Sequence, residues 1–203
     1  WLRKEYRWSA KVARAWLLLS PTDEEKALLD PELAHALVPT FSVLRGALRS
    51  WYQAMGQMAP ERAAESSSLL FYSGHGLAVA NEPVLVPADW PNDGLERLVS
   101  TDALADGLGG APVPQHLLLV DACRDHADGL PALHASSVLD PVEEVNEDFV
   151  CNLMSSTLRG WSAWAPGAAA DGPTVFGRAV LDGLRGYPDI RVESIGGANH
   201  IKS

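Results

Sequence analysis

The chain has 203 residues, of which 47% are hydrophobic and 21% charged, proportions that exclude a disordered, collagen-like or coiled-coil chain. It carries 16 Lys and Arg residues against 26 Asp and Glu residues, a net charge of −10. We therefore expect no nucleic-acid and no anionic membrane partner, and a preference for basic peptides or cations. Two cysteines, no apolar run of bilayer length and no signal peptide predict a cytoplasmic protein. Because the chain opens at Trp1, we expect it to be a fragment of a longer protein.

The first forty residues are predicted to be helical. Thr22 and Glu25 have the spacing of a capping box, and leucines recur at helical intervals from Leu28 until Pro39 ends the run. A second helix is predicted from 41 to 58, where apolar residues recur every three or four positions. This apolar stripe is most simply explained by core packing.

Short apolar runs replace the helical pattern after Pro60. They predict strands at 68–72, 84–86, 116–120 and 149–154, with a helix at 101–108 and a last helix between Thr174 and Gly186. Strands that are apolar on both faces and separated by helices indicate an α/β fold, with a mostly parallel sheet of five or six strands between helices. Chemistry collects at the carboxyl ends of such strands, where polar residues follow two of the predicted strands.

The stretch between Asp121 and Val150 is strongly acidic, and no helical or strand period organises residues 125–148. We interpret these residues as a long mobile loop beside the predicted site. The loop is either a solvated acidic linker or a segment with a role in activation or cation binding.

The residues that follow the two strands are suited to nucleophilic catalysis. Cys123 comes just after one buried strand, and His75, flanked by glycines, comes just after another. Neighbouring parallel strands lie about 5 Å apart, so the thiol and the imidazole can reach one substrate carbonyl. The backbone N–H groups of Gly76 and Cys123 are candidates for binding the oxyanion.

Other chemistries find little support in the sequence. Ser73 lacks the Gly-x-Ser-x-Gly elbow of esterases, the histidines lack zinc-ligand spacing, and no nucleotide-binding motif is present. We therefore expect neither a cofactor nor a metal.

The residues 72–76 (Tyr-Ser-Gly-His-Gly), followed by 121–124 (Asp-Ala-Cys-Arg), resemble the caspase-like superfamily, the clan CD cysteine peptidases of family C14. Residues 84–89 resemble the strand between the two halves of the dyad in metacaspases and bacterial relatives. Residues 156–164 are similar to the strand and loop that line the substrate in caspases. The resemblance extends over about 41–186 and implies a caspase-like three-layer sandwich. It implies one peptidase domain over 1–203, with 41–186 as its core and a less well matched part at 1–40.

The resemblance also suggests a substrate preference. Caspases have Gln two residues before the cysteine, whereas this chain has Asp121, as metacaspases and paracaspases do, and those relatives cleave after Arg or Lys. A carboxylate in the pocket for the P1 side chain favours a cation. Ser73 matches a small residue that lines the same pocket, and Ser156, Trp161 and Trp164 are further candidates for substrate binding. Core packing is the alternative for the two tryptophans.

These resemblances imply a cysteine endopeptidase that hydrolyses peptide bonds after Arg, or secondarily Lys, through Cys123 and His75. They also imply activation by a regulatory domain or partner, and a role in regulated cell death or defence, as in bacterial relatives. The alternative is a catalytically silent binding module that keeps the fold and holds a basic segment of a partner. The chain departs from the family at its opening strand, because no Asn-Tyr-Pro-like turn follows residues 15–19.

Overall fold

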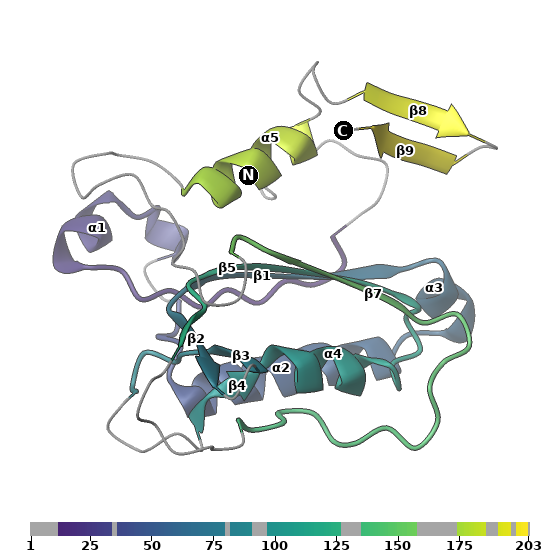
Figure 1. Cartoon of the computed structure of the whole chain (residues 1–203), viewed down its shortest axis with the longest axis horizontal. Helices are drawn as coiled ribbons and strands as arrows, with labels where there is room; N and C mark the ends of the chain where they lie inside the picture. Colours follow the sequence, from purple (N-terminus) through teal and green to yellow (C-terminus); the bar gives the residue numbers. More distant parts are fainter. Residues whose placement is uncertain are drawn as a thin grey trace.

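The computed structural model describes residues 12–33, 36–79, 82–90, 97–126, 135–157, 174–185, 191–195 and 198–202. These residues form an α/β fold in which a parallel sheet lies between helices (Figure 1). Helices α2 (Phe41–Gly56) and α4 (Thr101–Leu108) lie on one side of the sheet, and α5 (Val175–Arg185) lies on the other. The predicted fold class, a caspase-like layered arrangement, is confirmed.

The central sheet is parallel throughout, with the strand order β1-β5-β7. Its strands are β1 (Ser67–Gly74), β5 (Gln115–Ala122) and β7 (Val150–Ser155), which correspond to three of the four predicted strands. The register pairs Ser73 of β1 with Asp121 of β5. Because paired residues in a parallel sheet share a face, this register decides which polar groups gather at the carboxyl ends of the strands.

A second sheet continues beyond those carboxyl ends, with the order β4-β3-β2-β6. It contains β2 (Gly76–Val79), β3 (Glu82–Leu85), β4 (Val99–Ser100) and β6 (Asp125–His126). Strands β2 and β6 directly follow β1 and β5 along the chain and pair in parallel, while β3 pairs with β2 and β4 in antiparallel fashion. Among the described residues the main sheet therefore has three strands rather than the predicted five or six. The parallel pairing of β1 with β5 continues in β2 and β6, but these two strands belong to the smaller sheet.

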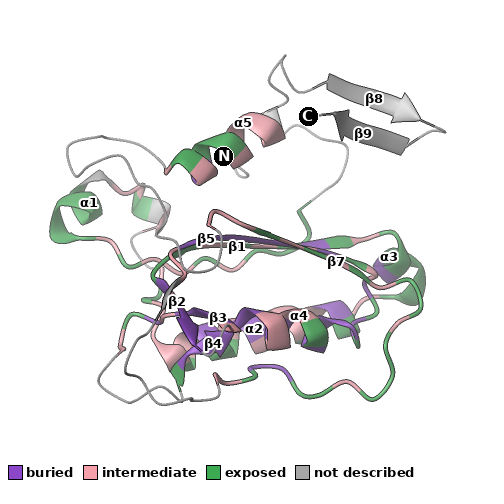
Figure 2. Cartoon of the chain, viewed as in Figure 1, coloured by how far each residue is buried: buried purple, intermediate pink, exposed green. Residues whose placement is uncertain are grey.

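The core lies between the central sheet and the two helices beneath it, where buried residues are concentrated (Figure 2). In α2 the predicted apolar stripe is buried at Leu44, Leu48 and Met55, which confirms core packing. Thr40 caps this helix, and the carboxylate of Asp89 accepts a 2.8 Å hydrogen bond from the N–H of Phe41. The start of α2 is thereby tied to the chain just after β3.

The prediction that the first forty residues are helical is wrong for most of the described part, residues 12–33 and 36–40. The capping box at Thr22 forms, but α1 (Asp23–Leu28) has only six residues and is followed by a short 3-10 helix (Pro31–Leu33). Proline at position 31 disfavours helical backbone at the preceding residue and removes a donor, which ends the helix despite the leucine spacing. Residues 15–19 form no strand and share one isolated bridge with the chain further on, between Leu18 and Leu37.

The outer strands of the central sheet are not buried on both faces. On the face turned away from α2 and α4, Leu69 is 40% exposed, Phe71 48% and Met154 52%. Leu119, on the central strand of the same face, is 3% exposed. Continuous apolar sequence therefore correctly predicted strands here, while burial on both sides holds for the middle strand alone.

Of the acidic loop predicted at 125–148, the first two residues form β6 and residues 127–134 lie outside the described residues. The described remainder, the acidic segment (residues 135–148), contains no helix or strand. Its apolar side chains pack on α4 and the turn after it: a Cβ on Gly107 would lie 2.8 Å from Cβ of Leu139, and one on Gly110 would lie 3.2 Å from both Cγ atoms of Val142. The N–H of Asn146 donates to the carbonyl oxygen of Gly109 at 2.8 Å. The acidic residues lie on a segment that covers one side of the core, away from the predicted site.

Candidate active site

The sheet register brings His75 and Cys123 to the same level of neighbouring strands. The β1–β5 ladder ends with Gly74 opposite Ala122, and the β2–β6 ladder resumes with Leu77 opposite Asp125. Both ladders have the same offset along the chain, so His75 is aligned with Cys123 in the gap between them. His75 is exposed and Cys123 is half-buried, which leaves a route from solvent to this edge of the sheet.

Gly76 lies against the backbone of Cys123. A Cβ built on Gly76 would lie 2.6 Å from the carbonyl oxygen of Cys123 and 2.9 Å from Cβ of Ala122. The start of β2 can approach the end of β5 and Cys123 this closely only because position 76 has no side chain. Close packing alone therefore explains why a glycine follows His75, independently of any role of its N–H in binding an oxyanion.

Asp121 lies on β5, two residues before Cys123. Asp121 is nearly inaccessible to solvent, because only 4% of its surface is exposed. Its register partner Ser73 is exposed, and Ser156 follows β7 on the other side of β5. The hydroxyl of Thr174, which caps α5 by accepting from the N–H of Gly177 at 2.9 Å, donates to Oδ2 of Asp121. In this structure the predicted P1 acid is thus bound by the start of α5.

Ser156 is turned toward the backbone of the central strand. Its N–H donates to the carbonyl oxygen of Val120 at 3.0 Å, and its hydroxyl lies 3.4 Å from the carbonyl oxygen of Ala122. The hydroxyl of Thr157 donates to the same Ala122 oxygen at 3.0 Å. These contacts fix the chain beside Cys123. The other two predicted substrate residues, Trp161 and Trp164, lie outside the described residues.

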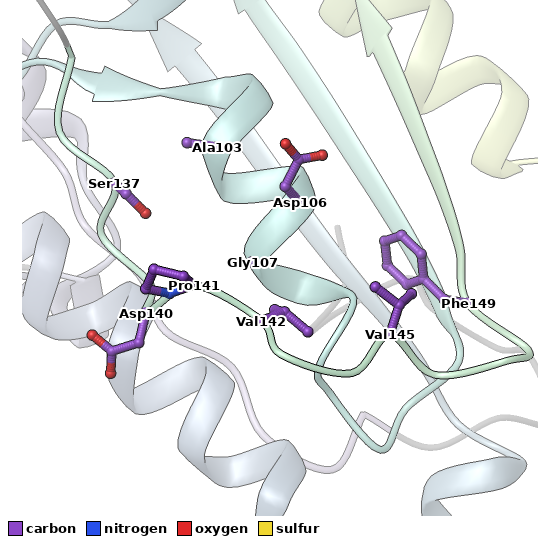
Figure 3. Close-up of a pocket in the computed structure, with 9 residues that line it drawn as sticks. All are labelled: Ala103, Asp106, Gly107, Ser137, Asp140, Pro141, Val142, Val145 and Phe149. Carbon is purple, nitrogen blue, oxygen red and sulfur yellow. The ribbon is translucent and has the colours of Figure 1, made fainter.

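Two cavities in the described part of the chain lie away from this edge of the sheet. One, of about 400 Å³, lies between α4 and the acidic segment and is lined by residues that include Asp106, Pro141 and Phe149 (Figure 3). The second, of about 420 Å³, lies between the same segment and α2. Neither is lined by a predicted site residue.

Two contacts of the site were not predicted from the sequence. Tyr72, which the sequence places in a buried strand, donates from its hydroxyl to the carbonyl oxygen of His75 at 2.8 Å. Thr174 is predicted as a helix cap, and that role is confirmed, but its bond to Asp121 joins positions 53 residues apart. A tyrosine directly before Ser-Gly-His is a signal for the first contact, whereas no local pattern signals the second.

Comparison with protein families agrees with this architecture. A family model described as the caspase domain of peptidase C14 matches residues 47–188, which is more than half of the chain. The chain therefore belongs to the caspase-domain family, a family of cysteine peptidases that act on protein substrates. Comparison with curated proteins returns no match. Within the described ranges, no helix is long and apolar enough to cross a membrane.

Proposed function

We propose that this chain is a cysteine endopeptidase in which Cys123 is the nucleophile and His75 is the general acid and base. The observation that carries the proposal is the shared register of the two parallel ladders, which aligns these residues at the carboxyl ends of adjacent strands. Family membership supports the same chemistry. A thiolate attacks a carbonyl readily, and an imidazole titrates in the range needed to take up and release a proton near neutral pH.

The proposed reaction proceeds through an acyl-enzyme. The thiolate of Cys123 attacks the scissile carbonyl, and the N–H groups of Gly76 and Cys123 stabilise the oxyanion. His75 then donates a proton to the leaving amine. With His75 as base, water attacks the thioester and releases the acid product and the thiol. Oxyanion donors of this kind contribute about 3–4 kcal/mol to lowering the barrier in comparable sites.

We further propose that Asp121 binds an Arg or, less favourably, Lys side chain at P1, with Ser73 and Ser156 beside it. A buried carboxylate pairs well with a guanidinium, which can donate two parallel hydrogen bonds. Because Oδ2 of Asp121 accepts from Thr174, a guanidinium that binds both carboxylate oxygens competes with the Thr174 hydroxyl. The hydrogen bond between Asp121 and Thr174 supports activation by a regulatory domain or partner that moves the start of α5.

The acid before the cysteine supports a metacaspase-like or paracaspase-like subtype. The two cysteines, Cys123 and Cys151, are not joined in a disulfide, which supports a reducing compartment such as the cytoplasm. A role in regulated cell death or defence is proposed by extension from bacterial relatives.

The test is cleavage of a peptide library randomised at P1, followed by kinetics on the best substrate. We expect Arg to be preferred over Lys, and Cys123→Ala to abolish cleavage. Asp121→Asn, which keeps the shape of the side chain and removes its charge, is expected to lower kcat/KM for Arg by about 100-fold and to spare substrates with a neutral P1. Full activity of Cys123→Ala would refute the proposed nucleophile, and a preference for acidic P1 would refute the role of Asp121 alone.

The second candidate is a non-catalytic module that holds a basic segment of a partner. The observation in its favour is the same hydrogen bond between Thr174 and Asp121, because a domain that does not turn over substrate can keep this bond. An irreversible thiol-reactive peptide with Arg at P1 separates the two functions. Labelling of Cys123 that is suppressed by an Arg-containing competitor supports the peptidase, whereas reversible binding without labelling supports the module.

A further inference from the structure

The hydroxyl of Tyr72 lies where the end of β1 meets the residue after β3. Its oxygen is 2.8 Å from the carbonyl oxygen of His75 and 3.0 Å from that of Val86, so the single proton is shared between two acceptors. The N–H of Val86 donates to the same His75 carbonyl oxygen at 3.0 Å. The backbone of His75 is therefore held from two directions by two different strands.

Gly74 leaves room for this arrangement. A Cβ at position 74 would lie 3.0 Å from the hydroxyl oxygen of Tyr72 and 3.2 Å from its Cζ atom, a tighter approach than side chains normally make. The phenol ring therefore folds against the bare backbone of Gly74 and reaches the peptide group beyond it. Burial raises the pKa of Tyr72 to about 12, so the hydroxyl keeps its proton, and remains a donor, across the physiological range.

The exposed imidazole of His75 takes its position from the backbone that carries it. General acid–base catalysis requires hydrogen-bond reach between the imidazole and the groups it serves, so a displaced His75 backbone lowers the rate without removing any reacting group. We propose that Tyr72 is a positioning residue that sets the place of the His75 imidazole through the His75 carbonyl oxygen. This inference rests on the proposed role of His75.

The first test compares Tyr72→Phe with Tyr52→Phe. Tyr52 is a half-buried tyrosine of α2 that packs against the same core, with its hydroxyl beside Gly110 rather than the site. We expect Tyr72→Phe to lower kcat about tenfold and to leave KM within twofold, the size of effect expected from one hydrogen bond. Tyr52→Phe is expected to keep the kcat of the parent protein.

The second measurement separates positioning from a loss of stability. The rate at which iodoacetamide alkylates Cys123 is followed against pH in a Cys151→Ser background, where one thiol reports. A neighbouring imidazole activates a thiol toward alkylation, so Tyr72→Phe is expected to slow the alkylation of Cys123 near neutral pH. Tyr52→Phe is expected to leave the alkylation rate unchanged.

A double-mutant cycle with Gly74→Ala tests the geometry itself. The new methyl group would push the ring of Tyr72 away, so Gly74→Ala is expected to cost much less in the Tyr72→Phe background than in the parent. Unchanged kcat and an unchanged alkylation rate in Tyr72→Phe overturn the positioning role, while Cys123-dependent cleavage by the parent still upholds the peptidase. If the parent cleaves nothing, the proposed function fails, and the alkylation profile alone decides whether Tyr72 places His75 near Cys123.

Discussion

Replacing Gly76 with Ala tests whether the close approach of two strands is what brings the site together. The added Cβ would lie 2.6 Å from the carbonyl oxygen of Cys123, 2.9 Å from Cβ of Ala122 and 3.2 Å from the carbonyl oxygen of Val84. The two carbonyl groups belong to the backbone of neighbouring segments and cannot rotate away. The substitution therefore forces a displacement of the backbone that carries Cys123.

The size of the displacement follows from these distances. Ordinary contact begins at 3.4 Å, so the Cys123 carbonyl oxygen and the new methyl group must separate by about 0.8 Å. A misplacement of about 1 Å costs about 100-fold in rate when reacting groups must be aligned. Overpacking of this kind also lowers the free energy of unfolding by about 1–3 kcal/mol.

The assay measures kcat/KM on an Arg-containing reporter together with urea denaturation. Gly46→Ala is the matched control, because a Cβ at this position in α2 meets nothing within 4 Å. Alanine is favoured over glycine inside a helix, so the control is expected to gain about 0.5–1 kcal/mol in stability and to keep its activity. If Gly76→Ala behaves like the control, the strands have room to spare and the argument from close approach is wrong.

Three further predictions concern other contacts. Thr174→Ala removes the hydroxyl that binds Asp121, so KM for an Arg substrate is expected to fall by up to about tenfold. Thr174→Ser keeps the hydroxyl and is expected to keep the KM of the parent. Equal KM values in both variants would contradict competition between this hydroxyl and the substrate. Burial lowers the pKa of His116 in the folded protein. As the pH falls below about 6.5, the unfolded chain therefore takes up a proton at His116 before the folded chain does. The free energy of unfolding is then expected to decrease by at most about 1.4 kcal/mol per pH unit. Denaturation of His116→Asn is expected to show a flatter dependence on pH, and an unchanged slope would assign the acid sensitivity elsewhere. Gly107→Ala would place a Cβ 2.8 Å from Cβ of Leu139, so thermal denaturation is expected to show a loss of about 1–3 kcal/mol unless the acidic segment is free to lift.

Much of the framework was predictable because local signals and burial agree. The apolar runs at β1, β5 and β7 mark strands, and Thr40 and Ser100 are side-chain caps that fix the starts of α2 and α4. The alignment of His75 with Cys123 follows from two such strands lying side by side in parallel. These features depend on residues that are close in sequence or on one pairing of adjacent strands.

The remaining features depend on contacts that no local pattern encodes. Leucine spacing predicted a long first helix, but a single proline at position 31 outweighs it. The acidic segment has no helical or strand period, so the sequence does not reveal that three of its apolar side chains pack on or beside α4. The bond between Thr174 and Asp121 joins distant positions through the tertiary fold, which composition and periodicity do not report.

The pairing of β1 with β5 also constrains how the protein matures. These strands are neighbours in space, but β2, β3, β4 and α4 lie between them in sequence, so their pairing is a non-local event that forms slowly compared with helices. During synthesis, the half that bears the histidine leaves the ribosome well before the half that bears the cysteine. His75 and Cys123 therefore cannot be aligned in a nascent chain until β5 has emerged and paired with β1, so any activity that needs both residues begins only after that point.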